Sequence, residues 1–132
     1  MADFIKKFSE ISINDLPLVG GKNASLGEMF SQLHAKGILV PDGFALTADA
    51  YRAFLKHNNL QKPLEKVLAT LDKTSFSNLD EVGKKARELI WEAAIPENIR
   101  ESIKTAYQDL CQQDNAALSL AVRSSATADI TW

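Results

Sequence analysis

Apolar residues recur at helical spacing through most of this chain. Four of them follow the dipeptide Gly20-Gly21 at positions i, i+3, i+4 and i+7, namely Leu26, Met29, Phe30 and Leu33. This spacing places them along one side of a helix. Similar stripes predict further helices within residues 50–55, 64–71, 79–90 and 99–110.

Polar residues, glycines and prolines mark where these helices should begin and end. Ser25 and Glu28 have the spacing of a capping box, although Asn23 could equally cap the first turn. Gly37 is placed to end the first helix as a glycine at the C′ position does. The remaining boundary signals are Thr47 as a cap, Pro63 in a first helical turn, and Pro96 at the opening of the last helix.

Strand patterns are few and lie far apart in the sequence. Residues 3–13 have a mixed apolar pattern that predicts a short strand and a turn, and residues 38–47 predict a short strand entering the core. Residues 118–123 alternate between apolar and small or polar side chains, which predicts a strand that ends at Arg123. The expected fold class is therefore helix-rich α+β.

Composition and charge exclude several classes of function. The chain has 132 residues, of which 45% are hydrophobic and 24% charged, as in an ordinary globular domain. Its net charge of -2 and scattered basic residues argue against a nucleic-acid partner. No apolar run approaches the ~20 residues of a membrane helix, so no membrane partner is expected. The single cysteine, Cys111, favours a reducing compartment, and the cytoplasm is the expected location.

The histidines and the cysteine offer little chemistry. His34 and His57 lie on separate predicted helices without neighbouring ligands at metal-binding spacing, so a metal site is not expected here. Cys111 has no base beside it in the sequence and is expected to be an inert thiol.

The first segment with the pattern of a binding site is Gly20-Gly21-Lys22 before a helix. Two glycines let the backbone approach an anion without a Cβ in the way, and the helix start adds N–H groups and a positive dipole end. A lysine there can place its ammonium on a phosphate. The spacing alone fits a phosphate loop and a simple glycine turn with a solvated lysine about equally.

The second such segment is residues 121–128, where an arginine leaves the predicted strand and small residues follow. Arg123 can donate two parallel N–H bonds to a phosphate, and Ser124 and Ser125 leave the approach open. By itself, the pattern fits an exposed charge at a strand end better than a binding site.

Taken together, three segments resemble the phosphoenolpyruvate-utilising dikinases in their order and separation. They are residues 20–29 (GGKNASLGEM), 40–47 (VPDGFALT) and 121–128 (AVRSSATA). Residues 23–29 are most similar to the phosphoenolpyruvate synthase (pyruvate, water dikinase) branch of that family. Pyruvate phosphate dikinases and rifamycin phosphotransferases are its relatives.

The resemblance implies a nucleotide site and the residues that form it. Residues 1–132 would be the first part of a single ATP-binding domain of the ATP-grasp kind. Lys22 and Arg123 would contact the ATP phosphates and converge on one site, with Gly20, Gly21, Ser124 and Ser125 as the supporting loop. The parent enzyme would convert pyruvate, ATP and water to phosphoenolpyruvate, AMP and phosphate. Its Mg²⁺ ligands, phosphate-carrying histidine and pyruvate-binding barrel would lie outside these residues.

The sequence departs from the family pattern at its end. After Ala128 the family usually continues with an acidic pair, a proline and a Ser-Phe-Ala-Gly segment, whereas residues 129–132 read DITW. We therefore expect a domain truncated at its C-terminal end, without catalytic residues, and inactive alone. The alternatives are a non-catalytic remnant, a binding module, or a fragment of a related dikinase.

Overall fold

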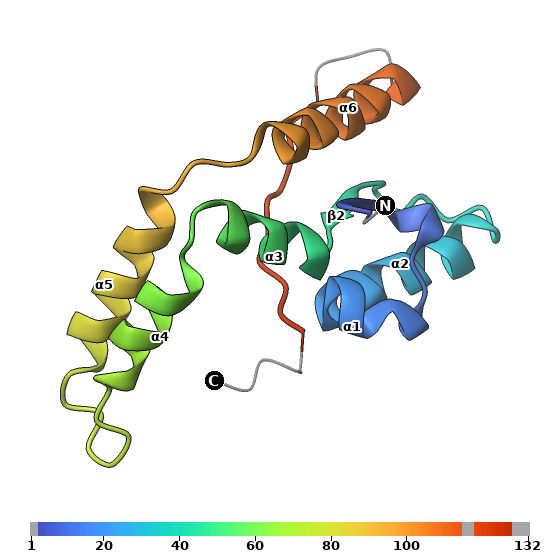
Figure 1. The fold of residues 1–132 in the computed structure, drawn as a ribbon. Helices are drawn as coiled ribbons and strands as arrows, with labels where there is room; N and C mark the ends of the chain where they lie inside the picture. The colour runs from blue at the N-terminus through green and yellow to red at the C-terminus, as the bar shows by residue number, and fades with distance from the viewer. Residues whose placement is uncertain (1–2, 115–117, 128–132) are drawn as a thin grey trace. The chain divides into compact units, whose positions relative to one another are not determined.

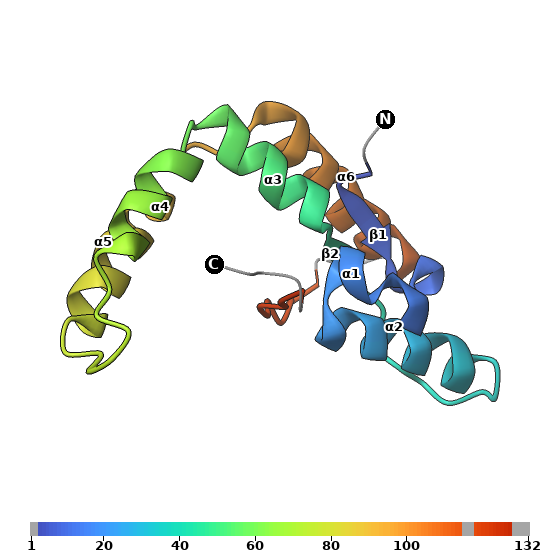
Figure 2. The ribbon, with the colours of Figure 1, turned by 60° about the horizontal axis from the view of Figure 1, so that its bottom comes forward.

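The computed structural model describes residues 3–114 and 118–127, and the chain divides into two compact units. The first unit comprises Met1–Tyr51 and Glu97–Trp132, and the second comprises Arg52–Pro96. Figures 1 and 2 show the elements in order along the chain. The division falls within helix α3 (Ala48–His57).

The first unit combines a small sheet with α-helices and two short 3-10 helices. The strands β1 (Ile5–Lys7) and β2 (Phe44–Leu46) pair antiparallel, with Lys6 opposite Ala45. Between them come η1 (Phe8–Glu10), η2 (Ile13–Asp15), α1 (Leu16–Val19) and α2 (Gly21–His34). The start of α3 and the whole of α6 (Glu97–Asp114) also belong to this unit. The fold is helix-rich α+β, as the sequence predicts.

The core of the first unit is built mainly from small and branched side chains. Its buried members are Ile11, Val19, Ala24 and Ala45, and none is more than 4% exposed. Side chains from the neighbouring 3-10 helix and from α1 pack around this cluster. The junction between α1 and α2 therefore lies on the core, and the residues at that junction have fixed surroundings.

Two glycines allow close approaches that a side chain would prevent. A Cβ added to Gly27 would lie 2.5 Å from Cβ and Cγ2 of Ile11, so α2 packs directly on the segment between η1 and η2. A Cβ on Gly43 would lie 2.7 Å from the ring of Phe8. The Phe8 amide also donates to the Gly43 carbonyl at 3.0 Å, which fixes the approach to β2.

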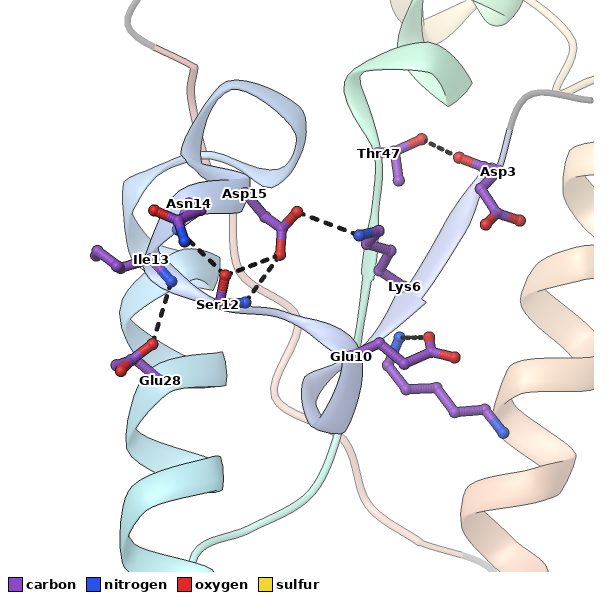
Figure 3. Close-up of polar contacts among 10 residues, drawn as sticks. Asp3, Lys6, Glu10, Ser12, Ile13, Asn14, Asp15, Glu28 and Thr47 are labelled. Atoms are coloured by element: carbon purple, nitrogen blue, oxygen red, sulfur yellow. Dashed lines mark hydrogen bonds and ion pairs between the residues drawn. The ribbon is translucent and has the colours of Figure 1, made fainter.

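A polar network holds the segment after β1 in place (Figure 3). The Asp15 carboxylate accepts from the Ser12 amide at 2.8 Å and pairs with the Lys6 ammonium at 3.2 Å. The hydrogen bond from the Ser12 backbone, followed by the nearby Lys6 charge, lowers the pKa of Asp15 despite its partial burial. Glu28 of α2 accepts from the Ile13 amide at 3.2 Å, which ties the helix to the same segment.

The second unit is a helical hairpin made by α4 (Gln61–Ala69) and α5 (Leu79–Trp91), with the end of α3 leading into it. Leu64 and Val82 are buried between the two helices. Asn58 closes the base of the hairpin, because its amide group donates to the Ala94 carbonyl at 2.8 Å and accepts from the Ala94 amide at 3.1 Å. At the other end, the Asp72 carboxylate binds the turn between α4 and α5.

Several predicted boundaries are confirmed. Thr47 caps α3, because its hydroxyl accepts from the Ala50 amide at 3.3 Å. Gly37 has a φ of 77°, and bonds from Gly37 N to the His34 carbonyl and from Ile38 N to the Leu33 carbonyl form a Schellman motif. Pro63 lies in the first turn of α4, and α6 begins directly after Pro96.

The predicted cap of α2 is wrong. The helix begins at Gly21 with Gly20 as its N-cap, so neither Asn23 nor Ser25 occupies that position. The reason is the Gly20 φ of 82°, which turns the chain from α1 directly into α2. The sequence pattern also gives no sign of α1 itself. The Asn23 side chain instead donates to the Val19 carbonyl at 2.9 Å, and so holds the end of α1 against α2.

The predicted buried stripe of α2 is wrong in part. The buried residues of the helix are Ala24 and Gly27, whereas Met29 is 46% exposed. Because Gly27 brings the helix backbone so close to Ile11, the small residues form the contact and the larger side chains lie at its margins.

Two of the predicted strand regions differ from the structure. Residues 118–127 contain no strand, and Val122 is 92% exposed. Alternation describes which side chains would face a core, but a strand also needs a hydrogen-bonding neighbour, and the described residues provide none for this segment. In the other region, only Phe44–Leu46 form a strand, while Leu39 is 94% exposed.

The contact between Gly27 and Ile11 predicts opposite effects for two glycine substitutions. Gly27→Ala should destabilise the chain by up to about 2 kcal/mol, because overpacking costs ~1–3 kcal/mol and the better helix propensity of alanine offsets ~1 kcal/mol of that cost. Gly83→Ala in α5 is the control, since only the flexible Arg87 guanidinium lies near its added Cβ, at 3.1 Å. It should stabilise by ~0.5–1 kcal/mol. Urea unfolding followed by circular dichroism measures both, and equal stabilisation by the two would contradict the packing.

The Asp15 network predicts a pH-dependent contribution to stability. Asp15→Asn should lower the free energy of unfolding at pH 7 by up to about 1 kcal/mol, because the ion pair with Lys6 is lost. Since the pKa of Asp15 is lowered from its ordinary value of 3.8, this contribution is present above pH 3.8 and is lost progressively as the pH falls from 3.8 through the lowered pKa.

Thermal melts at pH 7 and pH 3 measure the difference between wild type and Asp15→Asn. Asp3→Asn is the control, because only the Asp3 backbone carbonyl, and not its side chain, accepts the bond from Thr47. An Asp15→Asn penalty of the same size at both pH values would show that the carboxylate charge does not contribute.

Candidate functional site

The start of α2 carries the first predicted group of site residues. Gly20 is buried, Gly21 is half-buried and Lys22 is exposed as the second residue of the helix. In the part of the chain that the structure describes, the Lys22 ammonium has no hydrogen bond or ion pair. Lys22 therefore lies within the first turn of α2, with its charge open to solvent.

The helix start also presents unpaired backbone donors. Gly20 makes no side-chain cap, and the first N–H groups of any α-helix have no acceptor within the helix. The positive end of the helix dipole lies at the same place. Gly21 has open space in front of it, because an added Cβ would meet nothing within 4 Å. This surface can accept an anion at the amides of Gly21, Lys22 and Asn23.

Of the second predicted group, Arg123, Ser124 and Ser125, only Ser125 lies against the first group, at Gly20. A Cβ added to Gly20 would overlap the Ser125 hydroxyl oxygen and would lie 2.8 Å from the Ala126 carbonyl oxygen. In both ribbon views, the segment 118–127 ends beside α1 (Figures 1 and 2). Two motifs about a hundred residues apart in sequence therefore meet in space.

The contact sets an upper limit on how far the two charged residues are from each other. Lys22 is two residues after Gly20, and Arg123 is two residues before Ser125. Two residues span at most ~7 Å, so the Lys22 and Arg123 Cα atoms are no more than about 20 Å apart. Both side chains are long, and Arg123 is exposed with no hydrogen bond or ion pair to any residue that the structure describes. Convergence of the two charges on one ligand stays a prediction.

Ser125 has an unusual environment for a hydroxyl group. Its Oγ is fully covered, and no hydrogen-bond partner lies within reach among the described residues. A buried hydroxyl normally has a partner, because an unpaired one costs free energy. Ser124 is exposed, so the two serines of the predicted supporting loop differ in their surroundings.

Tyr107 contributes to this region although sequence reasoning missed it. Its hydroxyl donates to the Leu118 carbonyl at 3.1 Å, which ties the segment that carries Arg123 to α6. The hydrogen bond with the Cys111 thiol, followed by desolvation, raises the pKa of Tyr107. The spacing of Tyr107 and Cys111, one helical turn apart, was visible in the sequence, but nothing in it indicated the bond to Leu118.

The rest of the described chain adds no competing site. Among residues 3–114 and 118–127, no three His, Cys, Asp or Glu side chains gather to hold a metal ion. None of the helices in that part is both long and apolar enough to cross a bilayer. His34 stacks on Phe30 at a ring distance of 5.0 Å, a contact within α2 and at the opposite end from Lys22.

Comparison with known proteins identifies the family of this chain. Residues 16–130 match the family described as pyruvate phosphate dikinase, AMP/ATP-binding domain. The phosphoenolpyruvate synthase of Neisseria meningitidis is 47% identical over 131 residues, which is 98% of this chain and 16% of that protein. The phosphoenolpyruvate synthase of Synechocystis is 43% identical over 92% of this chain, and that of Escherichia coli is 38% identical over 92%.

These relatives are much longer than the chain, which spans 16%, 16% and 15% of their respective lengths. The match nevertheless contains both the Gly20–Lys22 and the Arg123–Ser125 motifs that meet in the structure. The family match extends over most of the residues of this chain. The chain therefore belongs to the pyruvate phosphate dikinase AMP/ATP-binding domain family.

Proposed function

We propose that this chain forms the phosphate-binding part of an ATP site in a phosphoenolpyruvate synthase. Lys22 and Arg123 contact the ATP phosphates, and Gly20, Gly21, Ser124 and Ser125 form the supporting loop. The observation that carries the proposal is the packing of Ser125 and Ala126 on Gly20, which brings the two motifs together. The names of the relatives and of the matched family support ATP as the ligand.

The residues at this place fit a phosphate group. Exposed Lys22 supplies a mobile positive charge, and Arg123 supplies a planar guanidinium that can grip two phosphate oxygens. The amides at the start of α2 supply further donors for an anion. Basic side chains and helix amides are groups that phosphates bind.

The chemistry that follows from these residues is positioning and charge stabilisation. In phosphoryl transfer, negative charge is spread over phosphate oxygens, and the protein's main task is to hold them in line and stabilise that charge. Lys22 and Arg123 would do so from two sides of the phosphate chain. The parent reaction would convert pyruvate, ATP and water to phosphoenolpyruvate, AMP and phosphate, and the remaining lobes of its ATP-grasp domain would supply the rest of the site.

Magnesium belongs to the proposed ATP site but not to these residues. No three His, Cys, Asp or Glu side chains gather in the described part of the chain. When bound, Mg²⁺ would neutralise charge on the phosphate oxygens. The proposed contribution of this chain is contact with the phosphates.

The proposal predicts that Lys22 and Arg123 each contribute to binding of Mg-ATP. We expect the 132-residue chain to bind it only weakly, with a Kd well above ~1 μM, because two exposed cations in water are heavily screened. Lys22→Ala and Arg123→Ala should each weaken binding about tenfold, or ~1.4 kcal/mol. Chemical-shift titration by nuclear magnetic resonance measures such weak affinities residue by residue.

The matched controls for this titration replace a lysine and an arginine that lie outside the proposed site. Lys36 follows the opposite end of α2, and Arg100 lies exposed on α6. Lys36→Ala and Arg100→Ala should leave the Kd within about twofold of wild type, since Lys36 follows the far end of α2 and Arg100 lies on another helix, α6. Equal losses in the control and site variants would indicate non-specific attraction of the anion and would contradict the site.

A further prediction concerns turnover by the isolated chain. We expect no AMP formation from ATP and pyruvate, because the described residues provide phosphate contacts but no metal-binding carboxylate group. A coupled assay for AMP release tests this outcome. Pyruvate-dependent AMP formation that persists after repurification, and that Lys22→Ala abolishes, would show that the chain holds a complete active site.

A further inference from the structure

We infer that Gly20 is a positioning residue, which seats Ser125 and Ala126 and thereby sets where Arg123 lies relative to Lys22. The consequence for nucleotide binding rests on the proposed function. The contact itself does not depend on that function and can be measured without any nucleotide. Gly20 would therefore act by leaving room for Ser125 and Ala126, and it would not itself touch a ligand.

The segment that carries Arg123 depends on few contacts for its position. Residues 118–127 form no helix or strand, so no ladder of backbone bonds holds them. At one end, the Tyr107 hydroxyl binds the Leu118 carbonyl. At the other end, Ser125 and Ala126 lie against Gly20. Arg123 lies between these two contacts, so a change at either one moves it.

Gly20 itself cannot retreat to make room for a side chain. Its amide donates to the Leu16 carbonyl at 2.9 Å, and its own carbonyl accepts from the Ala24 amide at 2.9 Å. It is buried on the core cluster that contains Val19 and Ala24. An added Cβ would overlap the Ser125 hydroxyl oxygen and lie 3.0 Å from the Ala126 carbonyl carbon. A side chain at position 20 would therefore displace the segment 118–127, and the junction between α1 and α2 would stay in place.

The neighbouring glycine does not share this role. An added Cβ on Gly21 would meet nothing within 4 Å, although Gly21 is the next residue of the same pair. The two glycines therefore have separable tasks. Gly21 leaves the start of α2 open to solvent, whereas Gly20 receives the second motif.

The test compares Gly20→Ala with two alanine controls in the 132-residue chain. Gly21→Ala changes the same glycine pair in open space. Gly37→Ala has a comparable positive φ of 77°, against 82° at Gly20, and again open space, so it measures backbone strain without the contact. Circular dichroism checks that each variant keeps its helix content.

The first measurement is the set of nuclear Overhauser effects between the α-protons at position 20 and the protons of Ser125 and Ala126. We expect Gly20→Ala to abolish them and to shift the Arg123 amide resonance, while Gly21→Ala and Gly37→Ala retain both. The second measurement is titration with the non-hydrolysable Mg-AMPPNP. Gly20→Ala should weaken binding roughly tenfold, because a displacement of about an ångström is enough to lose that much in a positioned site.

A second pair of variants covers the case in which Gly20→Ala does not fold. Ser125→Val adds bulk from the opposite side of the contact and leaves the backbone of α2 unchanged. Ser124→Val is its control, since Ser124 is exposed. Ser125→Val should reproduce the lost Overhauser effects and the weaker AMPPNP binding, whereas Ser124→Val should retain the Overhauser effects.

The two measurements separate failure of this inference from failure of the proposed function. Retention of the Overhauser effects between positions 20 and 125 in both Gly20→Ala and Ser125→Val would overturn the inference. So would their loss in Gly21→Ala to the same extent. If the variants lose the contact while wild type shows no AMPPNP binding at all, Gly20 keeps its seating role and the ATP site is rejected.

Discussion

The turn at Gly20 is the constraint on which the arrangement of this chain's binding motifs depends. Its positive φ lets α1 run directly into α2, and its two backbone bonds hold both helices at the junction. The same residue is buried on the core of the first unit and receives Ser125. One residue without a side chain thus joins the fold of this unit to the proposed site.

The core beneath this junction explains why the turn is well defined. Ala24 and Gly27 let α2 approach Ile11 closely, and the Asp15 network holds the segment that carries Ile11 (Figure 3). Small contact residues leave little freedom for the helix to shift, because protein interiors are close-packed. The amides at the start of α2 are consequently held in one direction, as an anion site requires.

The second motif is held differently, by contacts at its two ends rather than by secondary structure. Tyr107 binds the chain at Leu118, and the Gly20 junction receives it at Ser125. An exposed arginine on such a segment can adjust to a ligand while staying near it. This combination fits the proposed division of roles, with a rigid helix start that presents Lys22 and a less constrained segment that presents Arg123.

The sequence by itself determined the helix-rich α+β class, most helix boundaries and the two motifs. These properties follow from local chemistry: apolar spacing defines helices, Thr47 and Gly37 act on their immediate neighbours, and glycine next to lysine marks a helix start. The order and spacing of the motifs were also enough for the resemblance to the dikinases, and the family match confirmed it.

Tertiary structure alone decided which residues meet and which patterns become structure. The alternation in residues 118–123 did not become a strand, because strand formation depends on a hydrogen-bonding neighbour that local spacing cannot supply. The N-cap of α2 is Gly20 and not a residue that the sequence pattern predicted, because the preceding helix and its core contacts set where the turn falls. Above all, the contact between Gly20 and Ser125 joins positions about a hundred residues apart, and only the packed fold could place one against the other.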